Sequence, residues 1–207
     1  VQTCALPIWA CDLTTGRADF AVTTIGQYLK NKPDGVIVGV IDQSQGADAL
    51  VLNARDHPYL TSVDWLPKLV AEKAREGKKP VLAYTGNSPS EELMNELSNT
   101  FEEFKPSQFD LVSVDQSATA LFMLDQNEAD LAIVWEPDTT AARKAGNVVA
   151  YSSKDVPNSI VDVIVRDAES MASLDFATAT FETPRRATVT GLKPNASVYH
   201  RGDTMSL

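Results

Sequence analysis

The chain has 207 residues, a net charge of −10 at pH 7 and a hydrophobic fraction of 43%. This length allows one large or two small domains with a buried core. The acidic balance argues against a nucleic-acid partner, because phosphate-binding surfaces are usually basic, and no apolar run has the length of a membrane span. A small anionic ligand stays compatible with the charge, because helix N-termini bind anions even in acidic proteins.

The first 11 residues, VQTCALPIWAC, carry no charge and no amphipathic period. They resemble translated sequencing-adapter sequence, so we expect 1–11 to be a non-native or disordered leader. The alternative, a degenerate lipoprotein cleavage site, lacks the basic segment that such signals carry. Cys4 and Cys11 can pair with each other, but without a nearby histidine they make a poor metal site. No metal and no cofactor is predicted, and the redox compartment stays undecided.

The first part of the chain predicts three strands and two helices. The strands are expected at 18–22, 36–41 and 49–52, and the helices at 24–30 and 62–76. The run VIVGVI at 36–41 is apolar throughout and β-branched at most positions, the pattern of a strand buried on both faces.

The second part is more regular, with strands and helices in alternation. Ser88 is expected to cap a helix that starts at Pro89, with Glu91 at the capping-box position. This alternation predicts an α/β fold with a largely parallel sheet. The expected strands are 81–84, 109–114, 130–135, 148–151 and 160–166, and the expected helices begin at 88, 117 and 139.

From residue 168 the composition changes to Ala, Thr and Ser with Pro and Gly breakers. We interpret 168–207 as a linker or the start of a further domain, with ATVTGL as its one expected strand.

The strongest candidate site is the turn from Thr85 to Ser90, which follows an apolar strand and opens a helix. Hydroxyl groups and backbone N–H groups at a helix N-terminus favour an oxyanion. The alternative is a well-capped helix without a ligand. The nucleotide-hydrolase phosphate loop and the Rossmann fingerprint are both absent. The residues proposed here for ligand binding are Thr85, Gly86, Asn87, Ser88 and Ser90.

A second candidate lies at Trp135 and Glu136, where a carboxylate beside an indole follows a strand. It can bind a cation or hold a hydrogen-bond network, or Glu136 can simply cap the next helix. Further polar residues follow other expected strands, each with the same ambiguity between ligand binding and capping. These additional candidates are Thr23, Thr24, Asp42, Gln43, Ser44, Gln116 and Ser117.

Catalytic residues are not apparent, so we predict that the chain is not an enzyme. His57 and His200 lie far apart in loop-like segments, and the chain has no Gly-x-Ser-x-Gly elbow and no His-Glu-x-x-His motif.

Four segments together resemble the periplasmic substrate-binding proteins of bacterial ABC importers, which have the type 2 fold. The similarity is to the nitrate, sulfonate and taurine class and to relatives that bind thiamine precursors. It covers residues 16–167. The segments are GRADFAVTT, AYTGNSPSEEL, ADLAIVWEPDTTAARKAG and VPNSIVDVIVRD.

This resemblance implies two α/β lobes, joined by a hinge, that close on a small solute. Residues 12–60 and 159–167 would form an incomplete lobe 1, and 61–158 would form lobe 2. Carried over by position, Thr23 and Thr24 contribute from lobe 1, and Thr85, Gly86, Ser88, Ser90 and Glu136 contribute from lobe 2. The strand and helix that normally precede GRADFAV are missing, which puts binding by this fragment in doubt.

The resemblance therefore implies a solute-binding component of an ABC importer with a permease subunit as partner. The expected location is the periplasm or cell envelope, although the fragment shows no signal peptide. An alternative is a ligand-sensing or scaffold module fused to an OmpA-like domain, because NASVYHRGDTMSL resembles connectors in such envelope proteins; peptidoglycan association would follow. A third is a biosynthetic enzyme on the same fold, for which no nucleophile or base can be named.

Overall fold

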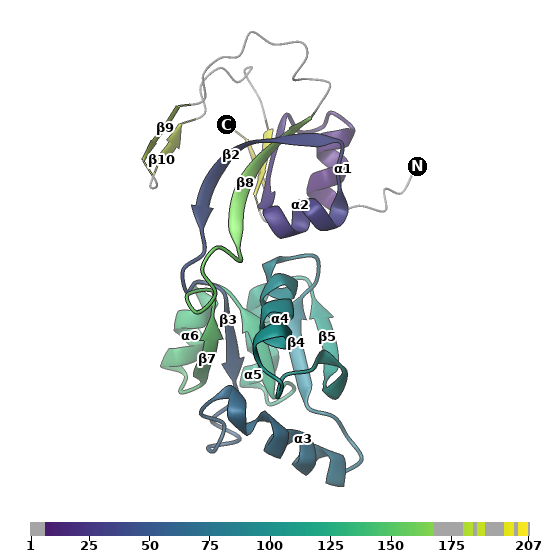
Figure 1. Ribbon diagram of the computed structural model, residues 1–207, viewed down its shortest axis with the longest axis vertical. Helices are drawn as coiled ribbons and strands as arrows, with labels where there is room; N and C mark the ends of the chain where they lie inside the picture. Colours follow the sequence, from purple (N-terminus) through teal and green to yellow (C-terminus); the bar gives the residue numbers. More distant parts are fainter. Residues whose placement is uncertain (1–6, 168–179, 184–185, 189–196, 201–202, 207) are drawn as a thin grey trace. The chain divides into compact units, whose positions relative to one another are not determined.

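The computed structural model describes residues 7–167, 180–183, 186–188, 197–200 and 203–206. The chain divides into two compact units. Unit 1 comprises residues 1–43 and 161–207, and unit 2 comprises residues 44–160. Each unit contains its own five-stranded sheet, and strands and helices alternate along the chain (Figure 1). The expected α/β class is therefore confirmed. The expected largely parallel sheet is wrong, because both five-stranded sheets are mixed and most of their strand pairs are antiparallel. The alternation of strands and helices in the sequence indicates the type of each element but does not fix the direction of each strand.

Unit 2 is built on a mixed sheet with the strand order β5-β4-β6-β3-β7. β4 pairs in parallel with both β5 and β6, whereas β3 pairs antiparallel with β6 and β7. The carboxyl ends of β4, β5 and β6 consequently share one edge of the sheet, which we call the carboxyl edge. The strands are β3 Ala49–Leu52, β4 Val81–Thr85, β5 Asp110–Val114, β6 Leu131–Val134 and β7 Val148–Ser152.

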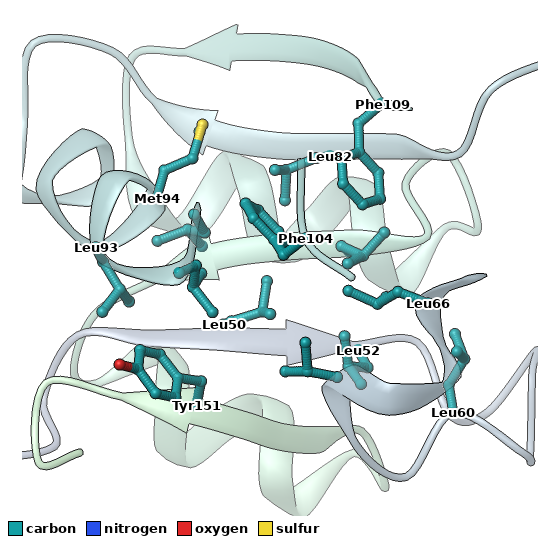
Figure 2. Packing of buried hydrophobic residues seen from close by; sticks show 14 of the residues in the cluster. Leu50, Leu52, Leu60, Leu66, Leu82, Leu93, Met94, Phe104, Phe109 and Tyr151 are labelled. Carbon is teal, nitrogen blue, oxygen red and sulfur yellow. The ribbon is translucent and has the colours of Figure 1, made fainter. Parts of the chain in front are cut away.

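Helices cover both faces of this sheet. Leu66 and Leu69 of α3 and Leu93 and Leu97 of α4 belong to one hydrophobic core, part of which Figure 2 shows. The other core takes alanine and leucine side chains from α5 and Ala142 from α6. The helical segments of unit 2 are η1 Val63–Trp65, α3 Leu66–Arg75, α4 Pro89–Thr100, η2 Pro106–Gln108, α5 Ser117–Asp125 and α6 Asp138–Lys144.

A buried carboxylate organises the start of β6, at the opposite end of the strands. Asp130 accepts a hydrogen bond from the backbone N–H of Val81 at 2.9 Å. Its other oxygen lies 2.7 Å from Nζ of Lys73 and 3.0 Å from Nε2 of His57. Asp130 therefore ties α3, the start of β4 and the loop after β3 to the start of β6.

Unit 1 has a sheet with the order β12-β11-β1-β8-β2, in which β8 pairs antiparallel with β1 and β2. Side chains of α1 and α2 pack with β1, β2 and β8 in one hydrophobic cluster. The elements are α1 Ile8–Thr14, β1 Phe20–Thr24, α2 Ile25–Asn31, β2 Gly35–Gln43, β8 Val161–Asp167, β11 Ser197–His200 and β12 Asp203–Ser206.

The expected disorder of the first 11 residues does not extend to residues 8–11. Ile8–Thr14 forms α1, and Trp9 and Ala10 are buried against Val163 and Val165 of β8. A helix of seven residues is too short to show a clear amphipathic period, which is why the sequence did not reveal it. Cys11 is disulfide-bonded, and Cys4, with which it was considered able to pair, lies outside the described residues.

The expectation that 36–41 is buried on both faces is wrong. Among the described strands, β2 pairs with β8 alone and forms an edge of the sheet. Val36 and Val40 are 43% and 58% exposed. An apolar β-branched run reports strand propensity, but the number of neighbouring strands depends on distant parts of the chain.

The division of the chain also differs from the expected lobes. β3 was expected in lobe 1, but it pairs with β6 and β7 inside unit 2, and all four of its residues are buried. The units therefore separate at residues 43/44 and 160/161 instead of 60/61 and 158/159.

Most of the expected linker or further domain at 168–207 lies outside the described residues. Within it, β11 pairs in parallel with β1. β9 Thr180–Thr183 and β10 Arg186–Thr188 form a two-stranded sheet, and β10 contains the first residues of the expected ATVTGL strand. In the part of the chain that the structure describes, no helix is both long and apolar enough to cross a bilayer.

Candidate ligand-binding site

Hydrogen bonds join the three corners at the carboxyl edge of unit 2. The backbone N–H of Gly86, after β4, donates to the carbonyl oxygen of Val114 in β5 at 3.4 Å. The backbone N–H of Trp135, after β6, donates to the hydroxyl oxygen of Ser117 at the start of α5 at 3.1 Å. The candidate residues that follow β4, β5 and β6 thus belong to one continuous edge.

The turn between β4 and α4 has the capping geometry that the sequence predicts. Ser88 is the N-cap and Pro89 the first helical residue. The Ser88 hydroxyl accepts from the N–H of Ser90 at 3.2 Å and donates to the carbonyl of Thr85 at 2.7 Å. The Glu91 carboxylate accepts from the N–H of Asn87 at 3.2 Å. Ser88 is therefore a structural cap.

This capping uses most of the backbone donors that were expected to bind an oxyanion. The N–H groups of Gly86, Asn87, Ser90 and Glu91 all donate within the protein, and Pro89 has none. A ligand at this corner therefore depends on side-chain donors more than on the backbone of the helix terminus.

Two hydroxyl groups at the corner have no hydrogen-bond partner among the described residues. They belong to Thr85, which is 6% exposed, and Ser90, which is fully buried. An unsatisfied buried hydroxyl costs about 1–3 kcal/mol, and native proteins keep few such groups. Thr85 Oγ1 and Ser90 Oγ are thus two buried hydroxyls at this corner whose donors a ligand can satisfy.

Gly86, which follows Thr85 in the turn, lies next to the neighbouring strand β5. A Cβ atom at this position would lie 2.4 Å from Oγ of Ser113 in β5. The β4–α4 turn therefore lies close to β5, and a side chain at Gly86 would require the exposed Ser113 hydroxyl to rotate away. Ser113 did not stand out in the sequence, because only strand pairing brings it next to Gly86.

At the β6–α6 corner, the structure supports the capping interpretation of Glu136. Its two carboxylate oxygens accept from the backbone N–H and the hydroxyl of Thr140 at 3.1 and 2.9 Å. The buried Ser117 hydroxyl is engaged by Trp135, as described above. Gln116, the N-cap residue of α5, is exposed. Trp135 is partly buried at the same edge.

Ser44 belongs to unit 2 and takes part in a buried hydroxyl chain. Its hydroxyl donates to Asp48 at 2.5 Å and lies 2.8 Å from the hydroxyl of Ser153. Ser153 also accepts from the N–H of Gly46 at 2.7 Å. This chain fastens the segment after β2 to the segment after β7, so Ser44 has a structural role. Ser153 was missed in the sequence because it lies 109 residues away.

The remaining candidates lie together at one end of the unit 1 sheet. In the strand register, Thr24 of β1 and Asp42 of β2 both lie opposite Asp162 of β8. Thr23 and Gln43 are their neighbours in the chain. The Thr24 hydroxyl accepts from the N–H of Gln27 at 3.1 Å and caps α2. Asp162 is 4% exposed. A lone acid inside the apolar run VDVIV was the signal that could have indicated it.

The described residues contain no group of three or more His, Cys, Asp or Glu side chains that could hold a metal. His57, one of the two histidines considered for catalysis, lies at the start of β6 in contact with Asp130, away from the carboxyl edge.

No protein-family model and no curated protein matches the chain. Solved structures do match it. The periplasmic aliphatic sulphonate binding protein SsuA from Escherichia coli is 19% identical with a TM-score of 0.58, covering 78% of this chain and 53% of that protein. The alkanesulfonate-binding protein SsuA from Xanthomonas axonopodis pv. citri, bound to MOPS, is 13% identical with a TM-score of 0.59, covering 79% and 53%.

An ABC uptake transporter substrate binding protein from Streptococcus pneumoniae with bound histidine is 10% identical, with a TM-score of 0.53 and coverage of 79% of this chain and 61% of that protein. The fold is thus the type 2 periplasmic-binding-protein fold, as predicted. The chain spans about half the length of the two sulfonate-binding proteins. Identities this low establish the fold and leave the ligand open.

Proposed function

We propose that this chain is the solute-binding component of an ABC-type importer and that it binds a small solute with an oxyanion group. The observation that carries the proposal is the pair of buried, unpartnered hydroxyls of Thr85 and Ser90. They lie at the carboxyl ends of parallel strands, where open α/β sheets bind ligands. The similarity in fold to periplasmic solute-binding proteins supports the same role.

In this function the protein binds and releases the solute without bond chemistry. The Thr85 and Ser90 hydroxyls donate to the oxyanion, while Ser88 and Glu91 hold the turn. Because both hydroxyl oxygens are enclosed, the solute reaches them only when it displaces the atoms that cover them. We also propose that the protein captures the solute by hinge closure and delivers it to a permease. Its proposed location is the periplasm.

A thermal-shift screen of the chain against nitrate, sulfonates, phosphate, carboxylates and pyrimidine amines tests this function. A solute at 100 times its Kd stabilises the bound form by about 2.7 kcal/mol. Selective stabilisation by one oxyanion class is expected. Thr85→Val and Ser90→Ala should each weaken that response.

Ser107→Ala is the matched control. Ser107 is exposed in η2, which precedes β5 and therefore lies at the opposite edge of the sheet. The thermal shift that each solute produces in Ser107→Ala should equal that in the wild type. A full panel without any shift, or unchanged affinity in both hydroxyl variants, contradicts the proposed function at this corner.

A further inference from the structure

We propose that Ser113 of β5 is a further solute-binding residue, and that its hydroxyl donates to the same oxyanion as the hydroxyls of Thr85 and Ser90. This inference rests on the proposed function and adds a donor to that site. Ser113 lies inside a strand and does not follow one, so its local sequence does not mark it for binding.

An oxyanion has more acceptor capacity than two hydroxyl groups fill. A carboxylate alone offers about four lone-pair sites, and a sulfonate or nitrate group carries a further oxygen. The backbone at the β4–α4 turn adds few donors, because the N–H groups of Gly86, Asn87 and Ser90 are already bonded within the protein. A third hydroxyl within reach of this turn therefore strengthens the binding of an oxyanion.

Ser113 lies on the face of the sheet that α4 covers. In the parallel pair of β4 and β5, Ser113 is opposite Tyr84, and residues opposite each other in register point to the same face of a sheet. Tyr84 packs against the core that contains Leu93 and Leu97 of α4. Ser90 is on the same buried side of that helix as these leucines. Ser90 and Ser113 therefore share one face of the sheet at its carboxyl edge.

The hydroxyl of Ser113 points at the backbone of Gly86. A Cβ atom on Gly86 would lie 2.4 Å from Ser113 Oγ but 3.7 Å from Ser113 Cβ. The hydroxyl therefore takes up the space that a side chain at position 86 would fill, directly after Thr85 in the turn. Ser113 is exposed and Ser90 is fully buried, so a solute that enters this corner meets the Ser113 hydroxyl first.

Titration calorimetry on the full chain tests the role of Ser113, with nitrate, methanesulfonate, acetate and inorganic phosphate as probes. For the probe that binds the wild type most tightly, Ser113→Ala should weaken binding about two- to tenfold, the range for one lost hydrogen bond. Ser113→Thr keeps a hydroxyl and should bind more tightly than Ser113→Ala. Ser107→Ala is the matched control, because it removes an exposed serine hydroxyl at the opposite edge of the sheet, and it should bind like the wild type.

A double-mutant cycle with Gly86 tests where the Ser113 hydroxyl lies. In Gly86→Ala the new methyl group forces this hydroxyl away, so binding should weaken about as much as in Ser113→Ala. Once the hydroxyl is removed, the methyl group meets Ser113 Cβ at 3.7 Å, an ordinary contact. Gly86→Ala should therefore cause no further loss of affinity in the Ser113→Ala background.

The outcomes separate the role of Ser113 from the proposed function. If a probe binds Ser113→Ala as tightly as the wild type, or if the two losses add in the double variant, the role of Ser113 is overturned and the solute-binding function stands. If no probe and no solute of the wider panel binds the wild type, the proposed function fails and the role of Ser113 fails with it.

Discussion

The hydroxyl of Ser88 donates a hydrogen bond of 2.7 Å to the backbone carbonyl of Thr85. It closes the β4–α4 turn from inside and at the same time accepts from the N–H of Ser90. Ser88 and Ser90, two serines in the same turn, therefore have opposite roles. The first has both partners within the turn, and the second has a buried hydroxyl without a partner among the described residues.

This difference predicts opposite effects of two alanine substitutions on stability. Ser88→Ala should lower the free energy of unfolding by about 1 kcal/mol, the usual cost of a lost N-cap. Ser90→Ala should leave it unchanged or raise it, because an unsatisfied buried hydroxyl is removed. Urea unfolding without solute measures both. Equal destabilisation by the two substitutions would show that Ser90 is also bonded in the native protein.

Trp9 predicts a structural role for the N-terminal segment. Trp9 is 8% exposed and packs in the core of unit 1, whereas its neighbour Ile8 is 64% exposed. Trp9→Ala should destabilise the protein by about 3 kcal/mol because it leaves a cavity, and deletion of residues 1–11 should act in the same direction. Ile8→Ala is the control and should cost less than about 0.5 kcal/mol. If the deletion leaves thermal unfolding unchanged, α1 contributes nothing to the fold.

Because Asp130 is buried, we expect that removing its negative charge lowers the free energy of unfolding strongly. Asp130→Asn leaves Lys73 Nζ, now 2.7 Å from the carboxylate, without its counter-charge. Because the aspartate side chain is only 7% exposed, we expect a loss of about 2–4 kcal/mol in the free energy of unfolding. Glu76→Gln is the control, since its pair with Lys78 is 62% and 69% exposed and such pairs contribute about 0–1 kcal/mol. A similar, small effect of both substitutions in urea unfolding would contradict the anchoring role.

The raised pKa of Tyr59 predicts that the protein loses stability at alkaline pH. Burial, and then the hydrogen bond to the Glu72 carboxylate, raise the pKa of Tyr59 above its usual range. The folded protein therefore keeps a proton that the unfolded chain releases near about pH 10. The stability that depends on this proton is complete below that pH and falls as the pH rises above it.

The measurement compares the wild type with Tyr59→Phe in urea at a series of pH values between about 8 and 11.5. The unfolding midpoint of the wild type should decrease more steeply above about pH 10 than that of the variant. Glu72→Gln should lie between the two, because it removes the carboxylate but leaves the burial. Parallel curves for wild type and Tyr59→Phe would exclude this explanation.

The capped helices were the most predictable part of the site. Ser88, Pro89 and Glu91 gave the start of α4, and the structure has the cap at Ser88. The corner after β6 was also correctly placed, but the sequence left open whether Glu136 binds a ligand or caps α6. In the structure both carboxylate oxygens of Glu136 accept hydrogen bonds from Thr140, and ligand binding by Glu136 stays a prediction.

Between residues 18 and 167 the sequence by itself determined the order and type of the main helices and strands, because apolar runs, proline, glycine and helix caps act over a few neighbouring residues. Tertiary structure decided that β3 joins unit 2 and that Val36 and Val40 lie on an edge strand. It also decided which hydroxyls keep an unused donor. Ser117 is bonded to Trp135, 18 residues away, and Ser44 to Ser153, 109 residues away. Thr85 and Ser90 have no such partner among the described residues, and only the folded arrangement of distant segments makes that difference.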